Sequence, residues 1–226
     1  MPPQERETLI PYGRAKLAPG DPGEPAVRVR AGAMLRLSDG PYPFPEPPDL
    51  VRIVTTADRL ALLNEHLQSL CSVWDRPAQA FLDAYFRWID RTIAANAEAL
   101  AAVSARTGGL FAPADWSFAA PRPLPQAHLC PDAGPPVRAD FAFWLGDGLL
   151  AIELRGAGTR RQRQEELARL AAAGIAVLAL DAVALQRDGA ALLASVLPPP
   201  FQRFFAGLLL PASPFGPALD EIRAAD

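Results

Sequence analysis

Residues 138–180 read RADFAFWLGDGLLAIELRGAGTRRQRQEELARLAAAGIAVLAL, and this stretch decides the fold. Residues 139–145 are predicted to form a strand, Gly146-Asp147-Gly148 a tight turn, and residues 149–155 the returning strand. Thr159 and Gln162 have the spacing of a helix capping box, and Gly174 is a natural end for that helix. Residues 175–180 form a continuous apolar run typical of a buried parallel strand. The order of hairpin, crossover helix and parallel strand predicts an α/β domain.

Towards the N-terminus, residues 56–106 have the spacing of apolar positions that is typical of helices. Two or three helices are predicted there, with a break near Asp75-Arg76-Pro77 and an end at Gly108-Gly109. A short strand is expected within residues 124–129. The apolar stripes predict core rather than a binding surface, and their members are Leu60, Leu63, Leu67, Leu70, Phe81, Tyr85, Trp88, Ile89 and Ile93.

Residues 1–50 form a Pro- and Gly-rich extension that holds many of the 25 prolines. Because proline lacks a backbone donor and has a fixed φ, residues 38–50 are expected to be an extended linker, with a short edge strand at residues 26–30. We therefore expect this extension, a helical segment at residues 51–106 that packs on the core, and an α/β core at residues 107–226. After Asp181 a further helix is predicted to reach Leu197, where three prolines end it.

The length and composition of the chain limit the classes of protein to which it can belong. A chain of 226 residues with 50% hydrophobic residues is long enough for one substantial core, and it has no apolar run long enough to cross a bilayer and no signal-peptide pattern. We expect a cytoplasmic protein. The two cysteines, Cys71 and Cys130, and the two histidines, His66 and His128, have no zinc-ligand spacing, so buried free thiols are expected.

Three ionisable residues lie on the strands of the predicted hairpin. Side chains alternate along a strand, so Glu153 and Arg155 project on the same side, and the turn can bring Asp140 of the partner strand towards Glu153. Two converging carboxylates repel each other unless a positive charge lies between them. A hard divalent cation with oxygen ligands, Mg²⁺ or Mn²⁺, is the usual solution.

These segments resemble the PD-(D/E)XK nuclease superfamily, and within it the very-short-patch-repair-like endonucleases. The resemblance is carried by Arg138-Ala-Asp140-Phe-Ala-Phe, Leu150-Ala-Ile-Glu153-Leu-Arg155-Gly156, the arginine-rich helix and Gly174-Ile-Ala-Val-Leu, and it extends from residue 124 to residue 180, about a quarter of the chain. It implies a restriction-endonuclease-like core in which Asp140 and Glu153 are metal ligands. A glutamate of the preceding helix sometimes assists in this family, and Glu98 is the candidate here.

The sequence departs from the family pattern at Arg155, where the family has lysine. An arginine supplies positive charge and bidentate phosphate contacts, but it stays protonated and cannot act as a general base. Two interpretations stay open: the metal activates the water without help from a lysine, or the site has lost its activity.

The resemblance implies a metal-dependent DNA endonuclease or nickase, a phosphodiester hydrolase. Asp140, Glu153 and Arg155 would be its catalytic residues, and Arg160, Arg161 and Arg163 would bind the DNA backbone, although the net charge of −3 is unusual for a nucleic-acid-binding protein. In the alternative interpretation these residues have no catalytic role. Glu153 and Arg155 then form a structural ion pair, and Arg160, Arg161 and Arg163 lie on a solvent-exposed helix face. Gln126 and His128 could line the same cleft.

A protein from a different functional class is the alternative, namely an inactive nuclease-like domain that binds nucleic acid or assembles with a partner protein. It predicts an exposed apolar surface around Phe201, Phe204 and Phe205.

Overall fold

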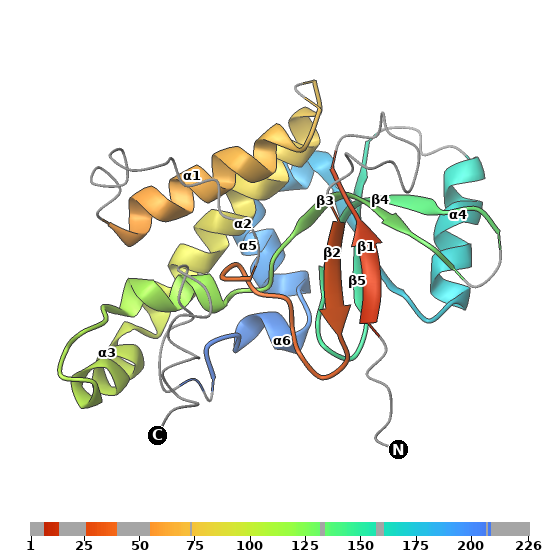
Figure 1. Ribbon diagram of the computed structural model, residues 1–226. Helices are drawn as coiled ribbons and strands as arrows, with labels where there is room; N and C mark the ends of the chain where they lie inside the picture. The colour runs from red at the N-terminus through yellow and green to blue at the C-terminus, as the bar shows by residue number, and fades with distance from the viewer. Residues whose placement is uncertain are drawn as a thin grey trace, which may run out of the picture.

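The structure is a computed structural model that describes residues 7–13, 26–39, 55–72, 74–131, 134–156, 161–206 and 208. Figure 1 shows the helices and strands. In chain order they are β1 (Glu7–Pro11), β2 (Ala26–Arg30), α1 (Thr56–Ser69), α2 (Arg76–Ala95), α3 (Ala97–Arg106), the 3-10 helix η2 (Pro113–Ala119), β3 (Leu124–Leu129), β4 (Val137–Trp144), β5 (Leu149–Arg155), α4 (Arg161–Ala172), β6 (Ala176–Asp181), α5 (Ala182–Val196) and α6 (Pro199–Gln202).

A four-stranded mixed sheet with the strand order β3-β4-β5-β6 forms the centre of the molecule. The strands β3, β4 and β5 are antiparallel neighbours, and β6 returns parallel to β5 after the crossover helix α4. The predicted order of hairpin, helix and parallel strand is therefore confirmed. The turn is tight because Leu145 N–H donates to the carbonyl of Gly148 at 3.0 Å, with Gly146 at a positive φ of 96°.

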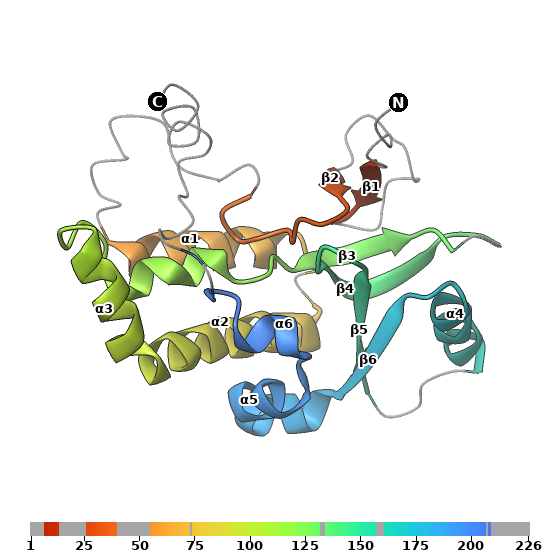
Figure 2. The same ribbon diagram turned by 90° about the horizontal axis from the view of Figure 1, so that it is seen from below.

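Helices cover both faces of the sheet, and Figure 2 shows α2 and α5 on one side of β5 and β6 and α4 on the other. One face contributes Phe141, Phe143 and Ile152 to the larger core cluster, together with residues of α1, α2 and α5. Ala151 of β5 packs in a second cluster with Leu167 and Leu170 of α4. The chain is thus a mixed α/β protein in three layers.

The helices of the N-terminal half begin and end where the sequence predicts. Asp75 caps α2, since its carboxylate accepts a hydrogen bond from Ala78 N–H at 3.1 Å, and the glycines at 108 and 109 follow α3 at positive φ. The predicted apolar stripes are buried, except that Leu70 is half-buried. Tyr85 donates from its hydroxyl to the carbonyl of Pro121 at 2.6 Å and joins α2 to the segment before β3.

The predicted edge strand at residues 26–30 exists as β2, which pairs with β1. Gly13 N–H donates to the carbonyl of Pro125 at 2.8 Å, so this ribbon continues beside β3. Arg36 donates to the carbonyls of Ala119 and Phe204 at 2.9 Å each. These bonds join residues 26–39 to the end of η2 and to the segment after α6. Most of the predicted linker, residues 40–50, and the predicted capping residue Thr159 lie outside the described residues.

Several expectations are wrong. Strand β6 is the edge of the sheet and largely half-buried rather than fully buried, because only β5 pairs with it. Cys71 is buried as expected, but Cys130 is exposed. The expected apolar partner surface at the C-terminal end is not exposed, since Phe201 and Phe204 are buried against Trp88 and Phe205 is partly buried in the same cluster.

Within the described part of the chain, none of the helices combines the length and apolar character that crossing a lipid bilayer requires.

Gly189 of α5 gives a test of the helix layer. A Cβ at this position would lie 2.4 Å from the Cβ of Ala84 in α2, whereas a Cβ at Gly148 would meet nothing within 4 Å. We expect Gly189→Ala to lower the free energy of unfolding by about 1–3 kcal/mol through overpacking. The matched variant Gly148→Ala should change it by less than about 0.5 kcal/mol. Chemical denaturation measures both, and equal effects would contradict the close approach of α2 and α5.

Candidate active site

Three polar residues lie in a row across β3, β4 and β5. The pairs on either side of Gln126 place it opposite Asp140 on β4. The ladder between β4 and β5 ends at Phe141 and Ile152, and the same register places Asp140 opposite Glu153. Because opposed residues of antiparallel strands share a face, the sheet brings these side chains together. The predicted approach of Asp140 and Glu153 is therefore present.

Asp140 is half-buried, and its carboxylate accepts a hydrogen bond from Leu154 N–H at 2.8 Å. Burial raises the pKa of Asp140 to about 6 from 3.8; the negative charges of Glu153 and Asp75 act in the same direction, against the Leu154 N–H and the charge of Arg163. The carboxylate form of Asp140 is thus under-compensated by positive charge.

Glu153 is only 6% exposed and is bound by Arg163 of α4. The guanidinium contacts both carboxylate oxygens: Nε donates to Oε1 at 2.8 Å and Nη2 donates to Oε2. Its third nitrogen, Nη1, donates to Glu166 at 3.0 Å. These two carboxylates raise the pKa of Arg163 further above its ordinary value. The ion partner of Glu153 is therefore Arg163, and the alternative interpretation, in which Glu153 pairs with Arg155, is wrong.

Asp75 joins the cluster from the turn between α1 and α2, and sequence reasoning missed it as a site residue. Gln126, which is 5% exposed, approaches Asp75 with its side-chain amide at 3.5 Å. Gln126 also has a positive φ of 51°, a backbone conformation that costs a residue with a side chain about 1–2 kcal/mol. Strained backbone of this kind is found at functional sites, and at Gln126 it coincides with a buried polar side chain at the row.

Negative charge is in excess at this cluster. Burial raises the pKa of Cys71 to about 12, and the charges of Asp75 and Asp140 add to the effect. Within residues that the structure describes, Arg163 is the one cation paired with any of Asp75, Asp140 and Glu153. Of these three carboxylates only Glu153 is paired with a cation, and a further cation would be favourable beside Asp140.

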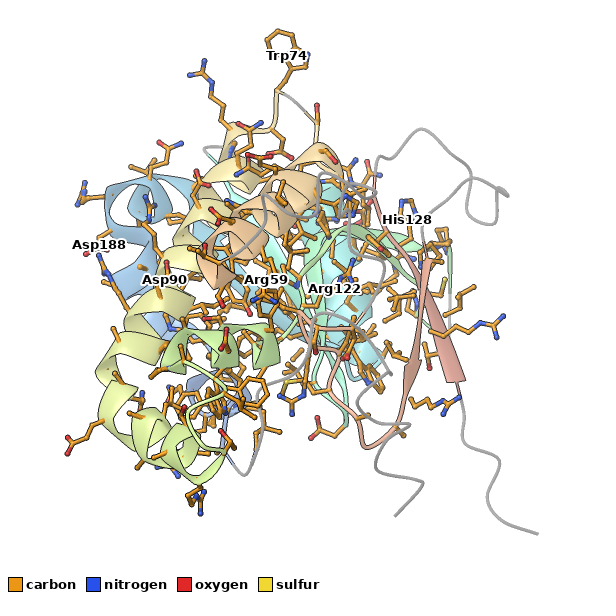
Figure 3. The ribbon with its side chains drawn as sticks, turned by 60° about the vertical axis from the view of Figure 1, so that its left-hand side comes forward. Arg59, Trp74, Asp90, Arg122, His128 and Asp188 are labelled. Carbon is orange, nitrogen blue, oxygen red and sulfur yellow. The ribbon has the colours of Figure 1, made fainter. Side chains whose placement is uncertain are left out.

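A cationic row lies next to the polar row. His128 pairs with Arg138 in the ladder of β3 and β4. Arg138 lies two residues before Asp140 on β4, and Arg155 lies two residues after Glu153 at the end of β5. Both arginines are exposed and His128 is half-buried, and Figure 3 labels His128 on β3. Neither arginine has an ion pair or hydrogen bond with another described residue. This row offers positive charge two residues along the strands from Asp140 and Glu153.

The other predicted residues are dispersed. Arg161 is exposed on α4 and pairs with Glu165 at 3.0 Å, and Arg160 lies outside the described residues. Glu98 is exposed on α3, which lies at the opposite end of the molecule from α4 in Figure 1 and Figure 2. The acidic residue that a helix of the N-terminal half brings to this cluster is Asp75 instead.

Comparisons with protein-family models, with curated proteins and with solved structures found no match to this chain. What the site does is therefore inferred from its own residues.

Replacing Asp140 tests the electrostatics of the site. The folded-state pKa of about 6 lies above the ordinary value of 3.8, so ionisation of Asp140 lowers stability as the pH rises between these values. Asp140→Asn keeps an acceptor for Leu154 N–H and removes the charge. In EDTA at pH 7–8 we expect it to increase the free energy of unfolding by up to about 3 kcal/mol, since one pKa unit corresponds to about 1.4 kcal/mol. Below pH 4 the two proteins should be equally stable.

Denaturation curves at several pH values measure this difference. The matched control is Asp147→Asn in the exposed β4–β5 turn, which should have little effect at any pH. A loss of stability in Asp140→Asn at pH 8 would show that Asp140 is a structural anchor and not an under-compensated carboxylate.

Proposed function

We propose that this chain is a metal-dependent DNA endonuclease or nickase of the PD-(D/E)XK type. The observation that carries the proposal is the position of Asp140 opposite Glu153, in a half-buried cluster with more carboxylates than cations. Carboxylates gathered in this way, where burial strengthens their repulsion, are typical of metal and catalytic sites.

The topology supports the assignment of a restriction-endonuclease-like core. An antiparallel meander of β3, β4 and β5 is followed by the crossover helix α4 and the parallel strand β6, with helices on both faces of the sheet. This is the arrangement that the resemblance of residues 124–180 implies. Fold alone does not determine function, so the proposal depends on the residues of the polar row.

The residues fit a divalent cation in part. Mg²⁺ commonly binds through one or two carboxylates and completes its shell with water, and Asp140 offers such a carboxylate. Glu153 would be the second ligand, but Arg163 donates to both of its oxygens and neutralises its charge, which weakens its attraction for a cation. Among the described residues, no group of three or more His, Cys, Asp or Glu side chains has the arrangement of a metal site. A bound Mg²⁺ or Mn²⁺ would lower the pKa of a water and stabilise charge on the phosphoryl oxygens.

The cationic row gives the substrate class. Arg138 and Arg155 would bind the phosphates of a DNA strand whose scissile phosphate lies at Asp140 and Glu153. Arg155 holds and polarises the phosphate in this proposal, since a guanidinium stays protonated. Hydrolysis forms a bond from the water oxygen to phosphorus and breaks one P–O ester bond, and the leaving oxygen takes up a proton.

A second candidate function is an inactive nuclease-like domain that binds nucleic acid. The contact of Arg163 with both oxygens of Glu153 favours it, because it neutralises Glu153 without a metal. Assembly with a partner protein has less support. The exposed large apolar side chains of the described residues, Leu9, Trp74, Leu110 and Val183, lie on separate elements, and Figure 3 shows Trp74 projecting alone from the α1–α2 turn.

Cleavage of supercoiled plasmid in Mg²⁺, Mn²⁺ or EDTA tests the proposed activity. We expect metal-dependent nicking that Glu153→Gln and Asp140→Asn each reduce by at least about 100-fold, as expected for groups that act at the reacting centre. Glu165→Gln, which changes an exposed carboxylate of α4, should leave the rate unchanged. Circular dichroism of each variant checks the fold.

Absence of nicking by the folded wild-type protein in every metal would contradict the hydrolase and favour the inactive domain.

DNA affinity tests the cationic row independently of cleavage. In EDTA, Arg138→Ala and Arg155→Ala should each weaken binding of a duplex and reduce the slope of log affinity against log salt by about 0.9, because each removes one phosphate contact. Arg187→Ala on α5 removes an exposed arginine outside the row and serves as the control. If all three variants have the same salt dependence, DNA does not bind along the row.

A further inference from the structure

We infer that Arg163 is a built-in competitor for the metal site, so that the guanidinium and a divalent cation bind Glu153 alternately. The inference rests on the proposed function and adds to it a device that controls when the metal binds. It explains why a carboxylate at the position of a metal ligand is neutralised by a residue of the same chain.

Arg163 and Glu153 form a two-point contact, in which Nε and Nη2 of Arg163 donate to the two oxygens of Glu153 and neutralise its charge. The pair is mostly buried, with side-chain exposures of 21% for Arg163 and 8% for Glu153. Solvent screens a pair in such surroundings little, so the guanidinium repels a divalent cation that approaches Glu153 and competes with it for this carboxylate.

Arg163 has a second anionic partner, Glu166. Glu166 lies one helical turn further along α4, and Nη1 of Arg163 already donates to it at 3.0 Å. When Arg163 leaves Glu153, its guanidinium keeps an anionic partner and is not left unpaired in a partly buried position. Two acidic partners for one arginine make two arrangements of the side chain available, one that blocks Glu153 and one that frees it.

Negative charge stays uncompensated when Arg163 is bound to Glu153. Asp140, next to Glu153 across the sheet, accepts a hydrogen bond from Leu154 N–H and has no ion pair with a cation among the described residues. A monovalent guanidinium on Glu153 therefore does not balance the cluster, whereas a divalent ion between Asp140 and Glu153 brings twice the charge. The cluster as a whole favours the metal, and the Glu153–Arg163 contact opposes it.

Mn²⁺ binding to the full chain, measured by isothermal titration calorimetry and by the loss of the free Mn²⁺ signal in electron paramagnetic resonance, tests this competition without any activity. We expect Arg163→Gln to bind Mn²⁺ at least about tenfold more tightly than wild type, a difference of about 1.4 kcal/mol. Arg161→Gln removes the same charge two residues away, from an exposed side chain that does not contact Glu153. It should change the affinity by about twofold or less, as screened surface charges do.

Two further variants keep the test decisive if Arg163→Gln folds poorly. Arg163→Lys retains the charge but has a single donor group and cannot form the two parallel contacts, so it should bind Mn²⁺ more tightly than wild type while remaining folded. Adding Glu153→Gln to Arg163→Gln should abolish the gain. Mn²⁺ should also raise the melting temperature of the Arg163→Gln protein more than that of wild type.

The outcomes separate the inference from the proposed function. If wild type binds Mn²⁺ and the Arg163 variants bind it no better than Arg161→Gln does, the competition is overturned and the metal site stands. If no variant binds Mn²⁺ at any pH between 6 and 8, the metal site itself and the proposed hydrolase are overturned together with the inference.

Discussion

The register of β4 and β5 is the constraint on which the rest of the site depends. The two-residue turn fixes it: Gly146 has a φ of 96° and Asp147 is not among the residues at positive φ, the pattern of a type II′ turn, which matches the twist of the strands it joins. A slip of one residue would turn Asp140 and Glu153 to opposite faces of the sheet. The same register brings the Asp140 carboxylate to Leu154 N–H.

The contact of Glu153 with Arg163 serves structure and function in opposite ways. It joins β5 to α4, and removing one member of such a buried pair typically costs about 3–5 kcal/mol of stability. In the competition that we infer, the same contact withholds Glu153 from a metal. Arg163 therefore has two roles: it stabilises the crossover helix α4 against the sheet, and it determines the charge that a substrate or cation meets at Glu153.

The fold could be predicted from local patterns where one residue type dictates the geometry. The alternation in the hairpin, the turn glycine, the proline after Asp75 and the apolar spacing in α2 are signals of this kind, and the corresponding elements are present. The 3-10 helix η2 was missed because Pro113–Ala119 has no periodicity long enough to detect. The burial of Phe201 was missed because it depends on the aromatic side chains of α2, more than a hundred residues earlier.

The site was predictable only within the hairpin. Strand alternation places Glu153 and Arg155 on one side, but it does not determine which arginine of the following helix reaches Glu153, because that depends on the rotation of α4 over the sheet. Asp75 lies 65 residues before Asp140, and the sequence around it predicted only a break between two helices. The residues around Asp75 do not indicate which end of which helix will lie beside the sheet.

The central claim is that Asp140 and Glu153 form a divalent-metal site. A crystal structure of the protein grown with Mn²⁺, with anomalous diffraction recorded at the manganese edge, tests it most directly. The account predicts an anomalous peak within about 2–2.5 Å of a carboxylate oxygen of Asp140 and of Glu153, with Arg163 turned to Glu166. A map with no peak there, and with Arg163 still bound to both oxygens of Glu153 at saturating Mn²⁺, would contradict it.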